Sequence, residues 1–281
     1  MSKKISVAER TGRAAAVVWT LLCAAPFVMI VLLAFKSNTD IFTNPLGIVG
    51  VTWNPSNFAD AWTGSVGGQG FFAYLVNSVV VTAAALIGCV SVGAFTAYFA
   101  SLASQGWRNA TVRVFLVATT LPLIMLLIPY YSGFSALSLL SSPWALGMVY
   151  AALCLPTCFL ILHGFYMGFP HEVREAAALD GLGMLGTFVR IVLPLSKGPL
   201  VAVAIMNGVF IWGETQLAIV LLQDPTSRTI PVGLLDFQGQ FTANTGAIFA
   251  GLTLATIPVI VIYLVFNRAV AKGVALGGVF R

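Results

Sequence analysis

Long stretches without a charged side chain constrain this chain more than any other feature. Residues 114–171 form 58 consecutive positions with no Asp, Glu, Lys or Arg, and residues 61–107 form another such stretch. Only 8% of the whole chain is charged and 59% is hydrophobic, whereas a soluble domain carries about 25% charge. Only helices and closed barrels satisfy their backbone inside a bilayer. Because the apolar runs are continuous, without the period-two alternation of barrel strands, we expect an all-α polytopic membrane protein.

The apolar runs predict six transmembrane helices. A helix needs about 20 apolar residues to cross the hydrocarbon, and the chain has six mainly apolar segments of that size. The expected spans cover residues 14–35, 71–100, 114–136, 144–167, 198–222 and 245–267. The first apolar stretch is longer than the roughly 7–15 residues of a signal peptide, so we interpret it as a retained span.

The distribution of Lys and Arg predicts the orientation. With six spans and the N-terminus inside, 12 of the 14 basic residues fall in cytoplasmic segments and only Lys36 and Arg228 fall outside. The positive-inside rule then places both termini in the cytoplasm, together with the loop 168–197. The basic residues flank the spans and form no patch, so the net charge of +5 does not indicate nucleic-acid binding.

The polar segment between the fourth and fifth spans has the sequence EAAALDGLGMLGTFVRIVLP, residues 175–194. Alanines and early carboxylates favour a short helix over 171–180, and Gly181 is suited to a left-handed cap. A second helix is expected over 184–190, with a bend at Pro194 before the fifth span. Two short helices joined at a glycine form a compact knob that can enter a groove on another protein. The alternative is an ordinary interfacial helix hairpin.

The spacing of this segment resembles a known motif. It reads E-A-A, three residues, Gly, nine residues, Ile, one residue, Leu-Pro, and this resembles the EAA loop of the permease subunit of binding-protein-dependent ABC importers. The chain is most similar to the carbohydrate-uptake branch, which includes the maltose permease subunit. The resemblance covers about residues 53–281 and includes Tyr74–Ser78 and the tail 273–279. It implies that the residues coupling the pore to an ATPase are Glu175, Ala176, Ala177, Asp180, Gly181, Ile191, Leu193 and Pro194.

The resemblance also implies a fold, a domain division and partners. The fold is the ABC-importer permease (MetI-like) fold, with an N-terminal tail, first span and outer loop over 1–70. The permease core covers 71–268, contains the coupling loop 168–197, and is followed by a cytoplasmic tail over 269–281. The implied partners are a second homologous permease subunit, two cytoplasmic ATPases, an extracytoplasmic solute-binding protein and the lipid bilayer. The implied location is the bacterial inner membrane, and the implied cargo is a sugar or oligosaccharide.

The chain lacks the residues expected of an ATPase or an enzyme. It contains no Gly-Lys dipeptide, so the phosphate-binding P-loop is absent. We therefore expect no cofactor on this chain and place ATP and Mg²⁺ on the partner ATPases. No cluster of catalytic or metal-ligating residues stands out, and we predict neither a metal site nor enzymatic activity.

Polar residues inside the expected spans are candidates for the solute path. Glu214, Gln216 and Asn207 lie in the fifth span, where a carboxylate is costly unless it faces protein or water. The alternative for this face is a structural contact with the partner subunit. Tyr130 and Tyr131 in the third span can stack on sugars, although tyrosines are also common interfacial anchors. One departure from the family is Trp212-Gly213-Glu214, where many relatives have a Trp-Asn pair.

Three alternatives arise from the sequence. One of them, a non-transporting membrane scaffold, would not need a glycine-hinged loop at this spacing. An importer of this class can carry another polar solute such as glycerol phosphate, although the spans contain no Lys or Arg to bind a phosphate ester. A transporter driven by an ion gradient would belong to a different class. It would require paired carboxylates at mid-membrane and internal repeats, and the sequence has one intramembrane Glu and no obvious repeat.

Overall fold

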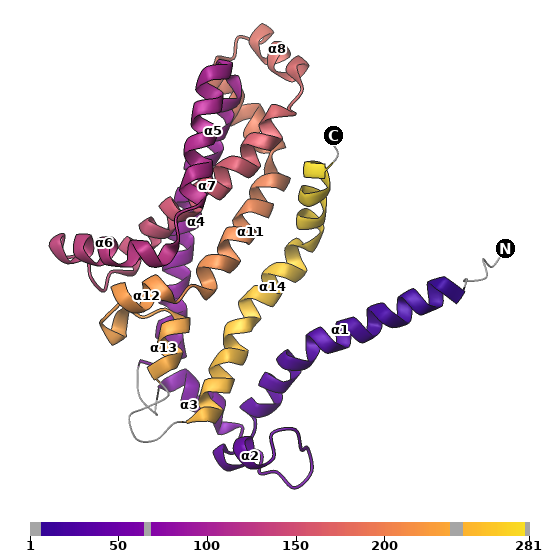
Figure 1. Ribbon diagram of the computed structural model, residues 1–281, viewed down its shortest axis with the longest axis vertical. Helices are drawn as coiled ribbons and strands as arrows, with labels where there is room; N and C mark the ends of the chain where they lie inside the picture. Colours follow the sequence, from indigo (N-terminus) through magenta and orange to yellow (C-terminus); the bar gives the residue numbers. More distant parts are fainter. Residues whose placement is uncertain (1–6, 65–68, 237–243, 279–281) are drawn as a thin grey trace. The chain divides into compact units, whose positions relative to one another are not determined.

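The computed structural model describes residues 7–64, 69–236 and 244–278, with side chains described for 11–64, 69–236 and 244–265. Within these ranges the chain is helical and contains no strand, apart from an isolated bridge between Lys36 and Trp53 (Figure 1). The all-α prediction is confirmed. The chain divides into two compact units, which are described separately.

The first unit comprises residues 1–72 and 234–256. It contains the long helix α1 (Val7–Ala34), two short helices, and the beginning of α14. The short helices are α2 (Asn38–Thr43) and α3 (Ser56–Thr63). Asn38 accepts a hydrogen bond from the backbone N–H of Gly246 through its Oδ1 (2.9 Å), which satisfies one of the free donors at the start of α14.

The second unit comprises residues 73–233 and 257–281. Its helices are α4 (Phe71–Leu102), α5 (Gln105–Thr119), α6 (Leu123–Ala136), α7 (Pro143–Met167), α8 (His171–Leu179), α9 (Met184–Thr187), α10 (Leu193–Leu195), α11 (Lys197–Gly213), α12 (Gln216–Leu221), α13 (Ile230–Asp236) and the rest of α14 (Thr245–Gly278). A π-helical turn over Phe188–Val192 joins α9 to α10, and a single 3₁₀ turn covers Pro225–Ser227. Helices α4 and α7 pack closely at small residues. A Cβ built on Gly147 would lie 2.7 Å from the Ala84 Cβ, and one on Gly93 would lie 2.8 Å from the Cys158 Cβ, as is common between membrane helices.

Within the described residues, four helices are long and apolar enough to cross a membrane. They cover Thr11–Ala34, Phe71–Leu102, Pro143–Met167 and Thr245–Val265. Two further spans arise only if each of two bent helix pairs is counted as one, namely Gln105–Thr119 with Leu123–Ala136 and Met184–Leu195 with Lys197–Gly213. The positions agree with the expected first, second, fourth and sixth spans, and a multi-pass membrane protein is confirmed.

The two remaining spans differ from the prediction. The expected third span, 114–136, is not one helix, because α5 ends at Thr119 and α6 begins at Leu123 at an angle of 91°. Pro122 has φ −65° and ψ 132°, an extended conformation that interrupts the helix. The expected fifth span, 198–222, breaks after Gly213 and resumes as α12. Both segments are hydrophobic on each side of the break, so hydropathy did not indicate where the helices end.

Candidate coupling hairpin and polar path

The coupling hairpin, residues 168–197, is built largely as the sequence predicts. Helix α8 covers His171–Leu179, and Gly181 takes a left-handed conformation (φ 77°). The N–H of Leu182 donates to Ala177 O (2.9 Å) and that of Gly181 to Ala178 O (3.0 Å). These two bonds form a Schellman cap, so the predicted glycine cap is confirmed.

The second arm of the hairpin differs in detail. It continues as a helix to Leu195, and the bend of 73° follows at Ser196 instead of at Pro194. The turn before the proline widens, and the N–H of Leu193 donates to Phe188 O. This π turn accommodates Pro194, which has no N–H to donate. The buried Ser196 hydroxyl then donates to Val192 O (2.6 Å).

An aromatic cluster that the sequence reading missed anchors the base of the hairpin. The Phe188 ring stacks on Tyr98 of α4, with ring centroids 5.0 Å apart and an interplanar angle of 26°. Tyr98 in turn meets Tyr166 of α7 edge-on at 5.8 Å. All three side chains are buried. The second arm therefore packs on α4 through Phe188, and Tyr98 links this contact to α7.

The far end of the hairpin is open. Glu175, Ala176, Asp180 and Gly181 are exposed, whereas Ala177 is buried. Leu179 is 90% exposed. In the described part of the chain, the Glu175 carboxylate has no hydrogen-bond partner or salt bridge. The alanine-rich face and this carboxylate are thus available to another protein. The remaining predicted coupling residues lie on the second arm, where Ile191 and Leu193 are half-buried and Pro194 is exposed.

Glu214, the charged residue among the predicted path residues, is bonded within the chain. Glu214 is 7% exposed. It accepts a hydrogen bond from the Tyr150 hydroxyl of α7. Its oxygens also accept the backbone N–H groups of Gln216 (2.7 Å), Leu217 and Ala218 at the start of α12. Both carboxylate oxygens are therefore occupied within the chain. Tyr150 is a partner that no sequence signal indicates, since 64 positions separate it from Glu214.

The other predicted path residues are dispersed. Asn207 is buried against α7, where its Nδ2 donates to Val203 O (2.9 Å) and to the Cys158 sulfur (3.4 Å). The Gln216 side chain is exposed. Tyr130 and Tyr131 lie on α6, beyond the 91° bend, and therefore not on a continuous third span. Their role in solute binding stays a prediction.

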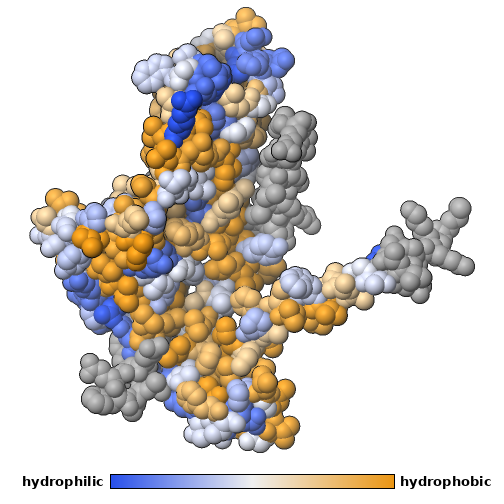
Figure 2. Space-filling view, in the orientation of Figure 1, coloured by the Kyte–Doolittle hydropathy of each residue, from blue (hydrophilic) through white to orange (hydrophobic). Residues whose placement is uncertain are grey.

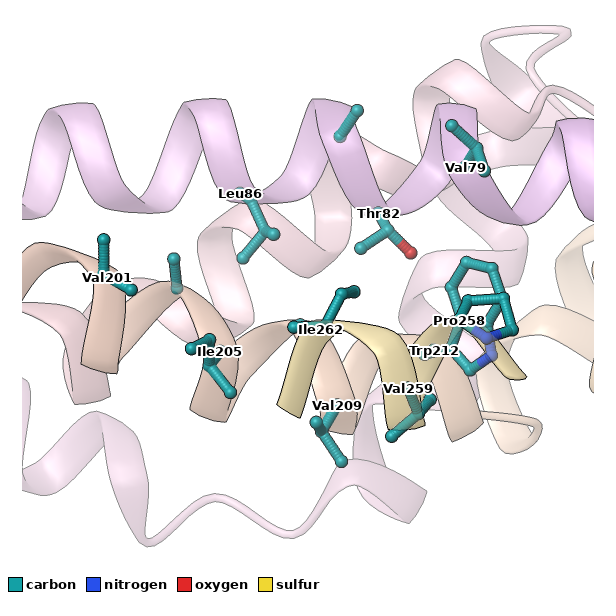
Figure 3. A pocket seen from close by; sticks show the side chains of 13 residues that line it. Val79, Thr82, Leu86, Val201, Ile205, Val209, Trp212, Pro258, Val259 and Ile262 are labelled. Carbon is teal, nitrogen blue, oxygen red and sulfur yellow. The ribbon is translucent and has the colours of Figure 1, made fainter. Parts of the chain in front are cut away.

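A cavity of about 410 Å³ lies between α4, α11 and α14 (Figure 3). Its walls are almost wholly apolar, with Leu86, Ile205, Gly208 and Pro258 among the lining residues. None of the predicted path residues lines it. A sugar needs hydrogen-bond partners for its hydroxyl groups, so we do not assign this cavity to solute binding.

Asn77 and Ser78, near the start of α4, form hydrogen bonds with the segment that connects α12 to α13. Asn77 Nδ2 donates to Thr226 O (2.8 Å) and Arg228 O (3.0 Å). The Ser78 hydroxyl accepts the N–H of Ile230 (2.9 Å). These bonds satisfy carbonyl and N–H groups that would otherwise be free beside an apolar helix.

Comparison with known proteins identifies the family. Residues 89–276 match the family described as "Binding-protein-dependent transport system inner membrane component". The probable ABC transporter permease protein YurM of Bacillus subtilis is 33% identical over 261 residues, which cover 93% of this chain and 85% of that protein. The chain belongs to this family. It is a permease subunit of an ABC importer, a transport component of the inner membrane rather than an enzyme.

Other relatives and one solved structure agree with this assignment. The permease is 29% identical to the diacetylchitobiose uptake permease NgcG of Streptomyces coelicolor, over 93% of this chain and 85% of that protein. It is 26% identical to the trehalose/maltose permease MalG of Thermococcus litoralis, over 93% of each chain. The crystal structure of a bacterial ABC transporter that imports alginate contains a chain with the same fold. The TM-score is 0.76 at 18% identity, covering 95% of the permease and 99% of that chain. Permeases of this family work with an ATPase and a solute-binding protein.

Proposed function

We propose that this permease forms half of the translocation pathway for a sugar or oligosaccharide that an extracytoplasmic solute-binding protein delivers. Relatives over more than nine-tenths of the chain are named for diacetylchitobiose and for trehalose and maltose uptake. The absence of Lys and Arg from the expected spans favours a neutral solute over a phosphate ester such as glycerol phosphate.

The proposed assembly contains a second homologous permease subunit and two cytoplasmic ATPases that bind ATP and Mg²⁺. The permease itself has six spans, both termini in the cytoplasm, and the division into residues 1–70, 71–268 and 269–281. Counting each bent helix pair as one span is consistent with six, and the basic residues then lie mainly on the cytoplasmic side.

The proposed mechanism rests on the coupling hairpin. Its exposed end, with the free Glu175 carboxylate and the bare alanine face, docks in a groove of the ATPase. Charge-assisted hydrogen bonds from the groove hold Glu175. Closure of the ATPases then moves α8, and the stack of Phe188 on Tyr98 (5.0 Å) transfers that movement to α4 and α7. The single observation that carries this proposal is that the exposed end of the hairpin, at Glu175, has no bonding partner in the described part of the chain, whereas its base, at Phe188, is buried and stacked on Tyr98.

A matched pair of glutamates tests the mechanism. Glu172 and Glu175 are both exposed and lie one turn apart on α8. Glu175→Ala is expected to reduce solute uptake by about tenfold or more, equivalent to about 1.4 kcal/mol, while Glu172→Ala leaves it nearly unchanged. Uptake is measured in proteoliposomes that contain the whole complex. Equal uptake by the two variants and the unmodified protein contradicts the coupling role.

The rate of ATP hydrolysis by the complex, measured with different solutes, tests which solute it transports. The complex, with its binding protein, is tested with trehalose, maltose, diacetylchitobiose and glycerol phosphate. Stimulation by one of the sugars supports the proposal, whereas stimulation by glycerol phosphate alone makes it a permease for another polar solute. Uptake that continues without ATP and follows an ion gradient indicates a secondary transporter instead.

A further inference from the structure

The residues after α1 form a closed loop around a buried lysine. Lys36 is 1% exposed, and its Nζ donates hydrogen bonds to the carbonyl oxygens of Asn44 (2.8 Å), Pro45 (2.8 Å) and Gly47 (2.7 Å). An ammonium group has three donors, so all of them are used inside the chain. The positive charge of Lys36 is therefore not presented to any partner. We call residues 36–54 the Lys36 loop.

Other polar groups close the same loop from within. The Ser37 N–H donates to Thr52 O (3.0 Å), and the Thr52 N–H donates to the Asp40 carboxylate (2.7 Å). Asn57 Nδ2 donates to Ala34 O and Lys36 O, at 2.9 Å each, and so caps the carbonyl end of α1. Carbonyl groups at a helix end are often left to water. Here side chains of the protein satisfy them.

The outward side of the Lys36 loop is apolar. Phe42, Leu46, Ile48 and Val49 are all strongly exposed, with Val49 reaching 89%. No charged residue occurs between Ile41 and Ala59, and the charges of Lys36 and Asp40 are both bonded within the loop. Figure 2 shows hydrophobic surface at the C-terminal end of α1. Contiguous exposed apolar side chains on a protein mark a contact with a membrane or another protein.

The position of the Lys36 loop indicates which of these it is. It follows directly on the 24-residue apolar stretch Thr11–Ala34. At 1.5 Å per residue that stretch is about 36 Å long, slightly more than the roughly 30 Å of hydrocarbon. The Lys36 loop therefore begins at the edge of the hydrocarbon and is continuous with the surface that α1 presents to lipid.

We propose that the Lys36 loop is a lipid-anchoring element, with Phe42, Leu46, Ile48 and Val49 inserted among the outermost acyl chain segments of the bilayer. Few waters are available there to bind free carbonyl groups, and the buried ammonium of Lys36 takes their place. A loop that docked a soluble protein only transiently would spend the rest of the time in water. It would need neither this internal bonding nor a charge-free outer side, because charged groups speed and orient protein docking.

The depth of a probe on Val49 tests this inference. Val49→Cys is introduced with Cys23→Ser, since Cys23 is the exposed cysteine and Cys89, Cys154 and Cys158 are buried. The site is labelled with an environment-sensitive fluorophore in the full complex, reconstituted in phosphatidylcholine vesicles. Nitroxide-labelled lipid and aqueous iodide serve as quenchers. The matched control is Leu179→Cys in the same background, because Leu179 and Val49 are almost equally exposed at 90% and 89%.

The expected result is loss of most of the Val49 probe's emission to the lipid quencher and little loss to iodide. The Leu179 probe should be insensitive to the lipid quencher. A probe at Leu46→Cys should repeat the Val49 result. Iodide quenching of the Val49 probe that is relieved only when the binding protein is added would overturn the inference in favour of a docking surface. Protection from both quenchers would overturn it in favour of a site covered by the partner permease. Neither outcome depends on the solute or on the role of Glu175.

Discussion

The coupling hairpin and the Lys36 loop are both polar connections next to membrane helices, yet their polar groups are used in opposite ways. In the hairpin, the Glu175 carboxylate is unpaired and exposed, and Leu179 is 90% exposed. In the Lys36 loop, the ammonium of Lys36 is 1% exposed and makes three hydrogen bonds to carbonyl oxygens. A segment that binds another protein keeps its charge available. A segment beside lipid must satisfy its charge internally, because the surroundings offer no partner.

The largest effect is expected from removing the buried ammonium. Lys36→Met leaves three carbonyl groups without a donor, each costing about 1–3 kcal/mol, so we expect a loss of about 3 kcal/mol or more in stability. The measurement is thermal unfolding of the purified complex, with hydrogen exchange over residues 36–54. Lys197→Met is the control, because Lys197 is exposed. Equal unfolding temperatures for the two variants would show that the Lys36 loop is not held by its lysine.

Glu214 is a third charged group whose polar contacts can be compared with those of Glu175 and Lys36. Its carboxylate is buried and bonded to α7 and α12. Glu214→Ala removes the acceptor for Tyr150 and for three N–H groups of α12. We expect a loss of about 2–3 kcal/mol, in the range for an unsatisfied buried group. Tyr150→Phe should cost less, about 1 kcal/mol, and the double variant should cost less than the sum of the two. A double-mutant cycle by thermal unfolding measures this coupling.

A second substitution of Glu214 tests whether this residue lies on the solute path. Glu214→Gln keeps one acceptor oxygen, which can serve the N–H groups of α12, and its amide N–H can donate to the Tyr150 hydroxyl oxygen. Normal assembly and stability with lost uptake would place Glu214 in the solute path, which is one of the two roles open to it from the sequence. Normal uptake would leave it the role of positioning α12.

A smaller effect is expected at the hinge of the coupling hairpin. Gly181 has φ 77°, and a Cβ built there meets no atom within 4 Å. The cost of Gly181→Ala is therefore conformational only, about 1–2 kcal/mol. Gly183→Ala is the matched control, since Gly183 has φ −70° and equally open space. We expect Gly181→Ala to lower the solute transported per ATP hydrolysed, and Gly183→Ala to leave it unchanged. Identical coupling ratios would contradict a hinge at Gly181.

The smallest effect concerns Asp40 of the Lys36 loop. The Thr52 N–H, the Ser37 hydroxyl and the nearby Lys36 charge lower the pKa of its carboxyl from the ordinary 3.8. A lowered pKa in the folded state means that its contribution to stability is complete above the unfolded value. That contribution is lost as the pH falls through the folded value. The protection of residues 36–54 from hydrogen exchange, relative to the intrinsic exchange rate at each pH, should therefore fall below about pH 4, and Asp40→Asn should remove this pH dependence.

Local sequence patterns determined much of the permease. Continuous apolar runs required membrane helices, because only a helix bonds its own backbone without water. The alanine-rich start of α8 and Gly181 specified a capped short helix, because propensity and a left-handed cap are local properties. The spacing from Glu175 to Pro194 identified the family, since that pattern is contiguous in the chain.

Contacts between distant residues were decided only in the tertiary structure. The break after Gly213 is held by Tyr150, 64 positions before Glu214, and hydrophobicity is the same for a straight span and a broken one. Phe188 stacks on Tyr98 only because α4 passes the base of the hairpin. The sequence places Lys36 in an outer segment with Arg228, and only the return of residues 44–47 to the end of α1 buries it. Side-chain periodicity reports which residues avoid water, but the partner that satisfies a buried charge depends on how the chain folds back on itself.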